Sequence, residues 1–384
     1  MPFDPRFTRR DALSYLGLGI ASAALPEFAG AAPLEFPKGS VIRTVLKDYA
    51  PEELAGGATL FHEHMSFATD FMIRWNGYSR ETRIANGLAP AGGGRAAAPP
   101  ATPPATPPAA PPGLFFTKDV DLMSSEMSAA KADGIACIVD GGHPDMGRDI
   151  NFLKQISKNS GLPIVAGGGF YTQPFYPKEI STMTEDQIFR ALVKQTEDDP
   201  IGVFGEIGSW DDISKDERKV FRAIGRAQIA TNLSIFTHTG IPGKSAMEQL
   251  DIFEDAGVDP KRIVIGHVGN LVDKTVAVQK ALCKRGVFIG FDRQGGPGDA
   301  QQVPMVMALI EAGYADHLMF SAYLSSAAQL KKNNGGGYAK TLTVFVPKLK
   351  AAGASDEVLR GIMQDNPRRF LAFVPKKPRK SSWT

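Results

Sequence analysis

Two histidines separated by one residue are the first groups in this chain that could do chemistry. His62-Glu63-His64 closes an apolar run that has the length of a β-strand. In an extended strand residues i and i+2 point to the same face, so the two imidazoles converge on one point. Because neutral imidazole is a common ligand of divalent ions, the pair indicates a metal site. The pattern occurs by chance in some chains of this composition, so its context has to strengthen it.

Two further histidines end strand-like runs later in the chain. His238 lies in Phe236-Thr237-His238-Thr239, and His267 follows Val264-Ile265-Gly266. Taken alone, each is a buried histidine that a neighbouring carbonyl would satisfy. Their joint placement at successive strand ends favours a shared metal ion, because buried imidazoles are costly unless they are partnered.

The roles of three other polar residues differ. Glu206, in Gly205-Glu206-Ile207-Gly208, ends a strand and is either a structural ion-pair partner or a bridge between two cations, which would satisfy it better. His143 either orients a ligand or belongs to a substrate loop. His317 begins the last strand, at the opposite end of the sheet, and is expected to be structural.

Eight apolar runs of strand length position these residues. They are nearly continuous in hydrophobic residues, as expected of parallel strands that are buried on both faces. The runs are Ala58–Glu63, Ala136–Gly142, Pro163–Phe170, Ile201–Gly208, Leu233–Thr239, Arg262–Val268, Gly286–Asp292 and His317–Tyr323. Amphipathic stretches of helical length lie between most of them, such as Glu185–Glu197, Lys215–Thr231, Ser245–Ala256 and Thr275–Arg285.

This repetition predicts an α/β fold, specifically a (β/α)8 TIM barrel, in which an active site lies at the carboxyl ends of the strands. A doubly wound open sheet is the competing architecture. It is disfavoured because no glycine-rich dinucleotide fingerprint follows an early strand. No residue is assigned to an organic cofactor.

Composition excludes several classes of protein. Of 384 residues 43% are hydrophobic, which is enough for a substantial core, and the formal net charge of +2 is too small to attract nucleic acid. The two cysteines, Cys137 and Cys283, cannot form a cysteine-rich zinc module or a disulfide framework. A bound metal must therefore use histidine and carboxylate ligands.

Three segments stand apart from the barrel, which is expected over residues 32–374. Residues 1–31 have the pattern of a twin-arginine-like export signal, with Arg9-Arg10 before an apolar stretch that is too short for a stable membrane anchor. A periplasmic or secreted protein is therefore expected. Residues 89–113 consist almost wholly of Pro, Ala and Gly and form a loop insertion. Residues 375–384 form a basic tail, which is expected to be solvated.

Six motifs follow one another along the chain. They are Phe61-His62-Glu63-His64, Val139-Asp140 with Gly147-Arg148-Asp149, Gly205-Glu206-Ile207-Gly208, Thr237-His238-Thr239, Ile265-Gly266-His267 and Asp365-Asn366-Pro367-Arg368-Arg369-Phe370-Leu371. Taken together and in order, they resemble the phosphotriesterase branch of the amidohydrolase superfamily, whose members include lactonases. The resemblance extends from residue 55 to 374 outside the insertion.

The resemblance implies a centre with two divalent metal ions. His62 and His64 would hold the more buried ion, and His238 and His267 the more exposed one. Glu206 stands where the family commonly has a carboxylated lysine that bridges the ions. Zinc is the expected metal, with iron, cobalt or manganese as alternatives, and a homodimer is one oligomeric state that the family allows.

In such a centre, two ions hold a bridging hydroxide and polarise a carbonyl or phosphoryl group, so the expected reaction is hydrolysis of a small molecule. A lactone or carboxylic ester is favoured over a phosphotriester, because Phe291-Asp292-Arg293 resembles the lactonase members. Tyr171 lies where those lactonases place an aromatic ring over the substrate. Arg293 and Tyr171 either contact substrate or only pack a loop.

The resemblance breaks at the eighth strand, where Ala322 occupies the position of an aspartate that ligates the buried ion and accepts a proton. Loss of that acceptor predicts a rate about 10²–10⁴-fold lower. Three explanations remain open: an inactivating substitution in an active enzyme, which the intact remaining site favours, a natural member that uses another base, or a relative that no longer turns over. The rival function is a periplasmic protein that binds metal and ligand without catalysis.

Overall fold

Eight strands form one parallel sheet in the computed structural model, and they follow the sheet in sequence order from β3 to β10. All eight expected strands are present, in shorter form at several ends. They are β3 (Ala58–Glu63), β4 (Ile135–Asp140), β5 (Ile164–Gly168), β6 (Ile201–Ser209), β7 (Ile235–Thr239), β8 (Ile263–Ile265), β9 (Phe288–Phe291) and β10 (Leu318–Phe320).

The first and last strands of the sheet lie next to each other, so the barrel is nearly closed. The His62 N–H of β3 donates a hydrogen bond of 3.0 Å to Ser321 Oγ, directly after β10. This arrangement confirms the TIM barrel and excludes the open doubly wound sheet, whose edge strands would lie far apart.

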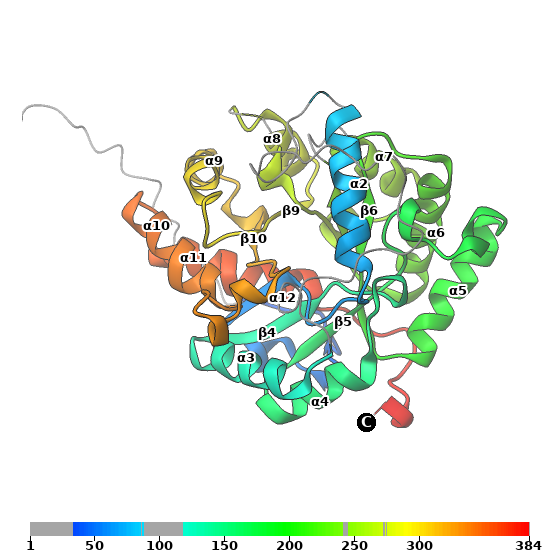
Figure 1. Ribbon diagram of the computed structural model, residues 1–384, viewed down its shortest axis with the longest axis horizontal. Helices are drawn as coiled ribbons and strands as arrows, with labels where there is room; N and C mark the ends of the chain where they lie inside the picture. Colours follow the sequence, from blue (N-terminus) through cyan, green and yellow to red (C-terminus); the bar gives the residue numbers. More distant parts are fainter. Residues whose placement is uncertain are drawn as a thin grey trace, which may run out of the picture. The chain divides into compact units, whose positions relative to one another are not determined.

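Helices surround the strands, as Figure 1 shows. The four expected helices are confirmed, two of them with a capping box, in which Thr184 caps α5 and Ser214 caps α6. The helices are α2 (Phe71–Ala85), α3 (Val120–Ala132), α4 (Ile150–Ser160), α5 (Glu185–Asp198), α6 (Lys215–Thr231), α7 (Ser245–Asp255), α8 (Ala277–Lys284), α9 (Asp299–Glu311), α10 (Val346–Ala351), α11 (Asp356–Arg360) and α12 (Asn366–Leu371).

The structure describes residues 34–85, 87, 118–240, 245–271, 273 and 275–383. The expected export signal at 1–31 lies outside this part of the chain, and so does the Pro/Ala-rich insertion at 89–113. Among the helices of the described ranges, none is both long and apolar enough to cross a membrane.

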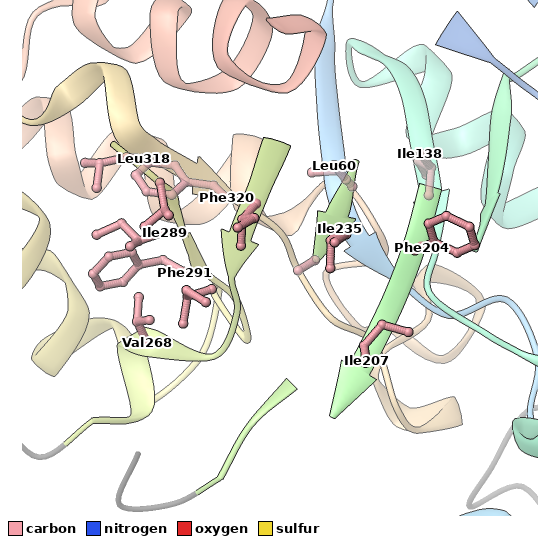
Figure 2. Packing of buried hydrophobic residues seen from close by; sticks show 14 of the residues in the cluster. Leu60, Ile138, Phe204, Ile207, Ile235, Val268, Ile289, Phe291, Leu318 and Phe320 are labelled. Carbon is pink, nitrogen blue, oxygen red and sulfur yellow. The ribbon is translucent and has the colours of Figure 1, made fainter. Parts of the chain in front are cut away.

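Two apolar layers hold the barrel together. The larger one fills the space between strands and helices, and Figure 2 shows part of it, including Leu60, Phe204 and Phe320. The smaller one fills the barrel interior with side chains that include Phe61 and Met319. The interior below the carboxyl ends of the strands is therefore packed, as is usual for this fold.

The C-terminal segment is exposed at Lys376, Lys377 and Lys380, as expected of a solvated tail, but Arg379 and Trp383 contact the barrel. Arg379 forms an ion pair of 3.1 Å with Asp48 and donates to the carbonyls of Thr44 and Val45. Trp383 is buried, and its indole N–H donates to the Asp198 carbonyl at 3.0 Å. Local charge predicts solvation, but an aromatic side chain four residues beyond Arg379 gives the segment an apolar anchor.

Candidate metal centre

One carboxylate lies at the centre of four imidazoles where the strands end. Glu206 Oε2 lies 3.0 Å from His62 Nε2 and 3.2 Å from His64 Nε2. Glu206 Oε1 lies 2.5 Å from His238 Nδ1 and 3.1 Å from His267 Nε2. Each carboxylate oxygen therefore faces one histidine pair, and the pairs are the two that the sequence predicts.

These residues come from different strands of the barrel. Glu206 lies within β6 and His238 within β7, while His62 lies in β3 and His64 follows it. An irregularity in the pairing of β3 with β4 lies between Leu60 and Glu63. It falls at the strand end that carries the His-x-His pair, where bulges commonly redirect side chains.

The donor set fits metal ions better than it fits hydrogen bonding alone. His62 Nε2, both nitrogens of His64 and Glu206 Oε2 are buried without a hydrogen-bond partner. Native proteins rarely leave such atoms unpaired, so each is a candidate ligand atom. Two ligand atoms that each lie about 2.0–2.2 Å from one ion are separated by about 3.4 Å at the tetrahedral angle. The distances of 3.0–3.2 Å from Glu206 to His62, His64 and His267 come close to this value.

Two sets of three residues share this geometry around Glu206. The carboxylate groups with His62 and His64 on one side and with His238 and His267 on the other, with ligand atoms within 4.8 Å of one another. Nitrogen and oxygen donors of this kind suit Zn²⁺ and other first-row divalent ions.

Burial and the neighbouring charges shift the pKa values of the cluster in opposite directions. Burial raises the pKa of Glu206, but His62 and His238 outweigh it and hold this pKa well below its usual range. Burial lowers the pKa of His62, yet Glu206 and Asp292 raise it to about 9. Burial and the neighbouring His267 lower the pKa of His238 to about 4. The Glu206 carboxylate is therefore ionised, and His62 and His238 differ in their protonation.

Asp292 is a member of the cluster that sequence reasoning missed. Its carboxylate accepts hydrogen bonds from His62 Nδ1 at 3.2 Å and from His267 Nδ1 at 2.8 Å. It groups with both histidines as a third potential ligand set. Its place directly after β9, at the same end as the histidines, is the signal that could have found it.

Glu63, between the two histidines, works outside the cluster. Its carboxylate accepts hydrogen bonds from Ser321 Oγ and from the backbone N–H groups of Ala322, Tyr323 and Leu324. The carboxylate thereby fixes the segment that follows β10 against β3.

The same segment corrects the expectation for Ala322. Its side chain belongs to the apolar layer between strands and helices, together with Leu318 and Phe320. Tyr323 instead places its ring 4.7 Å from the ring centroid of His62 and 4.9 Å from that of His267. The residue of this segment that faces the imidazoles is therefore Tyr323.

Tyr171 and Arg293 both lie at the cluster. The Tyr171 hydroxyl is 3.2 Å from His238 Nδ1 and accepts a hydrogen bond of 2.8 Å from Trp75 Nε1 on α2. The Arg293 guanidinium lies over the rings of Tyr323 and Trp75, at 5.0 and 5.9 Å from their centroids. Helix α2 therefore covers the cluster, and His238 is only 1% exposed.

The two remaining histidines lie apart from Glu206. His143 Nδ1 is 3.4 Å from Asp145 Oδ1, and Asp145 accepts a hydrogen bond from the Tyr171 backbone N–H. His143 thus lies on a loop near Tyr171. His317 lies before β10, and its Nδ1 is 2.8 Å from the Val287 carbonyl, as a structural histidine would be.

Comparison with known proteins gives the chain a wider context. A profile of the phosphotriesterase family matches residues 42–371. N-acetyltaurine hydrolase of Xenopus tropicalis is 26% identical over 359 residues, which cover 86% of this chain and 98% of that protein. N-acetyltaurine hydrolase of Dictyostelium discoideum is 28% identical over 276 residues, covering 67% and 74%.

Solved structures show the same architecture. A resiniferatoxin-binding protein from Rhodobacter sphaeroides is 25% identical, with a TM-score of 0.72 over 87% of this chain and 95% of that one. The phosphotriesterase homology protein from Escherichia coli, complexed with phosphate in its active site, is 24% identical, with a TM-score of 0.68 over 84% and 100%. The second likeness shows the fold alone.

Proposed function

Because this chain belongs to the phosphotriesterase family, we propose that it is a hydrolase whose centre holds two divalent metal ions. His62 and His64 would hold one ion, His238 and His267 the other, and Glu206 would bridge them. The observation that carries this proposal is that the two oxygens of Glu206 face different histidine pairs.

The residues of the chain have separate tasks in this proposal. Bound ions would supply Lewis acidity toward the scissile group and would lower the pKa of water. Asp292 accepts the Nδ1 protons of His62 and His267, which directs the Nε2 atoms of both rings toward Glu206. Burial raises the pKa of Tyr171, so its phenol stays protonated and can donate a hydrogen bond to substrate.

A lactone or carboxylic ester remains the first substrate candidate, ahead of a phosphotriester. A second candidate is an N-acyl amide, favoured by the relatives that are N-acetyltaurine hydrolases. In either case water is consumed, the acyl carbon gains a hydroxyl group, and the leaving oxygen or nitrogen gains a proton. The Arg9-Arg10 signal pattern supports a periplasmic or secreted location.

The proposal includes a turnover that is lowered by the missing aspartate. The structure changes the position at which an aspartate should be restored. An aspartate at position 322 would enter the apolar layer, whereas Tyr323 faces the imidazoles with a φ of 48°. Aspartate tolerates this left-handed backbone better than most residues. We therefore expect Tyr323→Asp to raise turnover by about 10²-fold and Ala322→Asp to leave it unchanged or lower. Equal turnover in Tyr323→Asp and the parent chain would contradict impairment.

Metal analysis beside a hydrolysis assay tests the function itself. The purified chain is reconstituted with Zn²⁺, Co²⁺ or Mn²⁺, its ion content is measured, and lactones, aryl esters, N-acyl amides and a phosphotriester are assayed. Two ions per chain with turnover of at least one substrate support the hydrolase. Two ions without turnover in the parent chain and in Tyr323→Asp would support the rival, a metal- and ligand-binding protein. Fewer than two ions would contradict the proposed centre.

A further inference from the structure

We propose that the substrate of this centre carries a negatively charged group, a sulfonate or a carboxylate, on its leaving-group side, and that Arg293 and Trp210 bind this group. The inference rests on the proposed function, because it assigns the far end of a substrate whose acyl group lies at Glu206.

Arg293 is a cation beside the cluster, and no carboxylate of the described ranges forms an ion pair with it. Within the described ranges Arg293 has no ion pair within 4.0 Å, and the carboxylate of the preceding Asp292 is occupied by His62 and His267. An arginine guanidinium is charged at any pH at which the protein is folded. Arg293 is half-buried, and charges that are partly removed from water are normally paired, so a substrate anion would supply a partner.

The backbone at Arg293 supports a specific placement. Its φ of 63° lies in the left-handed region, which non-glycine residues seldom adopt. Such a conformation persists where surrounding contacts impose it, and here the guanidinium is held between the rings of Tyr323 and Trp75. A guanidinium fixed in this way is prepared for planar or forked recognition of an oxyanion.

Trp210 offers a second donor next to Trp75. Its ring centroid lies 6.0 Å from that of Trp75 and 5.5 Å from that of His238. Its indole N–H is buried without a hydrogen-bond partner, and the side chain is 4% exposed. A buried N–H is costly to leave unpaired, so this donor also calls for an acceptor that the described residues do not provide.

Both donors therefore lie next to Trp75 beside the cluster. Trp210 Nε1 lacks an acceptor among the described residues, and Arg293 is hydrogen-bonded to the Tyr323 side chain but has no carboxylate partner there. A neutral leaving group would leave the indole N–H unpaired and the guanidinium without a counter-charge, and sites built around such donors discriminate strongly against substrates that lack the acceptor. Sulfonate and carboxylate share the required chemistry. They differ in shape, because a sulfonate has three oxygens and a carboxylate has two in one plane.

A matched set of substrates tests the inference. N-acetyltaurine, N-acetyl-β-alanine and N-acetylethanolamine share the acetyl group and the two-carbon linker and differ in the terminal sulfonate, carboxylate or hydroxyl. In the metal-loaded protein we expect kcat/KM for at least one anionic substrate to exceed that for the hydroxyl compound by about 10²-fold or more. The better of the two anions identifies the group. Phenyl acetate, a neutral ester, reports hydrolysis that is independent of the anion.

Two variants assign the preference to Arg293. Arg293→Gln removes the charge and is expected to reduce the ratio of anionic to neutral kcat/KM by about 30-fold or more, mainly through KM. Arg293→Lys keeps the charge but loses the fork and is expected to restore part of the ratio. Equal kcat/KM for charged and neutral substrates in the parent chain, or an unchanged ratio in Arg293→Gln, would overturn the inference.

Ligand binding gives a readout that does not require turnover. In a Trp383→Phe background the remaining tryptophans are Trp75 and Trp210, both beside Arg293, so titration with taurine or β-alanine is followed by fluorescence. Saturable quenching that Arg293→Gln weakens at least tenfold supports the inference. If quenching occurs but no substrate is hydrolysed, the proposed function fails and the anion site stands. If phenyl acetate is hydrolysed but no anion binds, the anion site fails alone.

Discussion

The two ends of the barrel treat buried polar groups in opposite ways. At the carboxyl ends of the strands, buried atoms of His62, His64, Glu206 and Trp210 have no hydrogen-bond partner. At the amino ends, ion pairs and backbone carbonyls hold the charged side chains, and Arg379 Nε is left without a hydrogen-bond partner.

The amino-end network is built from the first hairpin and the last residues of the chain. Arg43, at the end of β1 (Ile42–Arg43), binds both carboxylate oxygens of Asp48, at the start of β2 (Asp48–Tyr49), at 3.0 and 3.1 Å. Arg379 shares the same carboxylate, and the guanidinium groups of Arg43 and Arg379 lie over the Trp383 ring at 5.1 and 5.6 Å. This end joins the beginning and the end of the barrel and has a stabilising role.

The backbone at the carboxyl ends of the strands is also unusual. His267, Arg293 and Tyr323 adopt left-handed φ values of 57°, 63° and 48°, and all three lie at the carboxyl ends of the strands. Strained backbone and unpaired polar atoms persist together where a site has to bind something else. The comparison teaches that a cluster of unsatisfied groups at one end marks function, while ion pairs that satisfy most of the charged groups at the other end mark stability.

Removing the central carboxylate is expected to have the largest effect on the carboxyl end. Glu206→Gln keeps the size of the side chain but loses the charge that faces four imidazoles. Ion content should fall below one per chain and turnover by about 10³-fold. Glu217→Gln, which changes a buried carboxylate in the α6 cap, is the matched control and should retain both ions. Full ion content in Glu206→Gln would show that the carboxylate is not a ligand.

Changing Asp292 should have a smaller effect on ion binding than changing Glu206. Asp292→Asn leaves one acceptor for two Nδ1 donors, so one imidazole loses its orientation. We expect ion affinity to fall about 10–100-fold, with a changed Co²⁺ absorption spectrum. Glu126→Gln serves as the control, because Glu126 is a buried carboxylate that accepts only from the backbone of Lys331 and Lys332 among the hydrogen bonds described. An unchanged Co²⁺ affinity in Asp292→Asn would refute the orienting role.

Ion binding should depend on pH through His62. In the ion-free protein the pKa of His62 is about 9 and that of His238 is about 4, so of these two rings His62 is the one protonated near pH 7. Because an ion requires a neutral ring, binding at pH 7.5 should release about one proton from His62, and affinity should rise about tenfold per pH unit up to pH 9. Calorimetry in buffers of different ionisation enthalpy measures this proton. Binding without proton release would contradict the assignment.

The pKa shifts of His62 and His238 also determine how the stability of the ion-free protein changes with pH. The folded pKa of His62 lies above the unfolded value of 6.5, so its contribution is complete below pH 6.5 and is lost as pH rises to about 9. The folded pKa of His238 lies below 6.5, so stability is lost as pH falls from 6.5 toward 4. Melting temperatures of the ion-free protein should therefore decline on both sides of pH 6.5.

A change at the amino end should leave the metal centre intact. Trp383→Ala removes the ring over which Arg43 and Arg379 lie and should lower the free energy of unfolding by about 1–3 kcal/mol. Trp383→Phe keeps a ring and loses only the hydrogen bond to Asp198, which costs about 1 kcal/mol. Ion content should be unchanged in both variants. Loss of ions in Trp383→Ala would remove the distinction between the two ends.

Much of the barrel could be predicted because its signals are local. Near-continuous apolar runs identified all eight strands, and the limits of β3, Ala58–Glu63, were correct at both ends. The proximity of His62, His64, Glu206, His238 and His267 followed from their places at strand ends, since parallel strands of a barrel present these ends on one face. Their roles as metal ligands remain predictions that the ion measurements decide.

What the sequence determined by itself was therefore the set of strands and the end at which polar side chains gather. Only the tertiary structure decided that Asp292 joins His62 to His267, that Tyr323 and not Ala322 faces the imidazoles, and that Trp383 anchors the tail. The physical reason is that a hydrophobic pattern is set within one strand. The direction of a side chain at a strand end depends on register, bulges and contacts with residues far away in the chain.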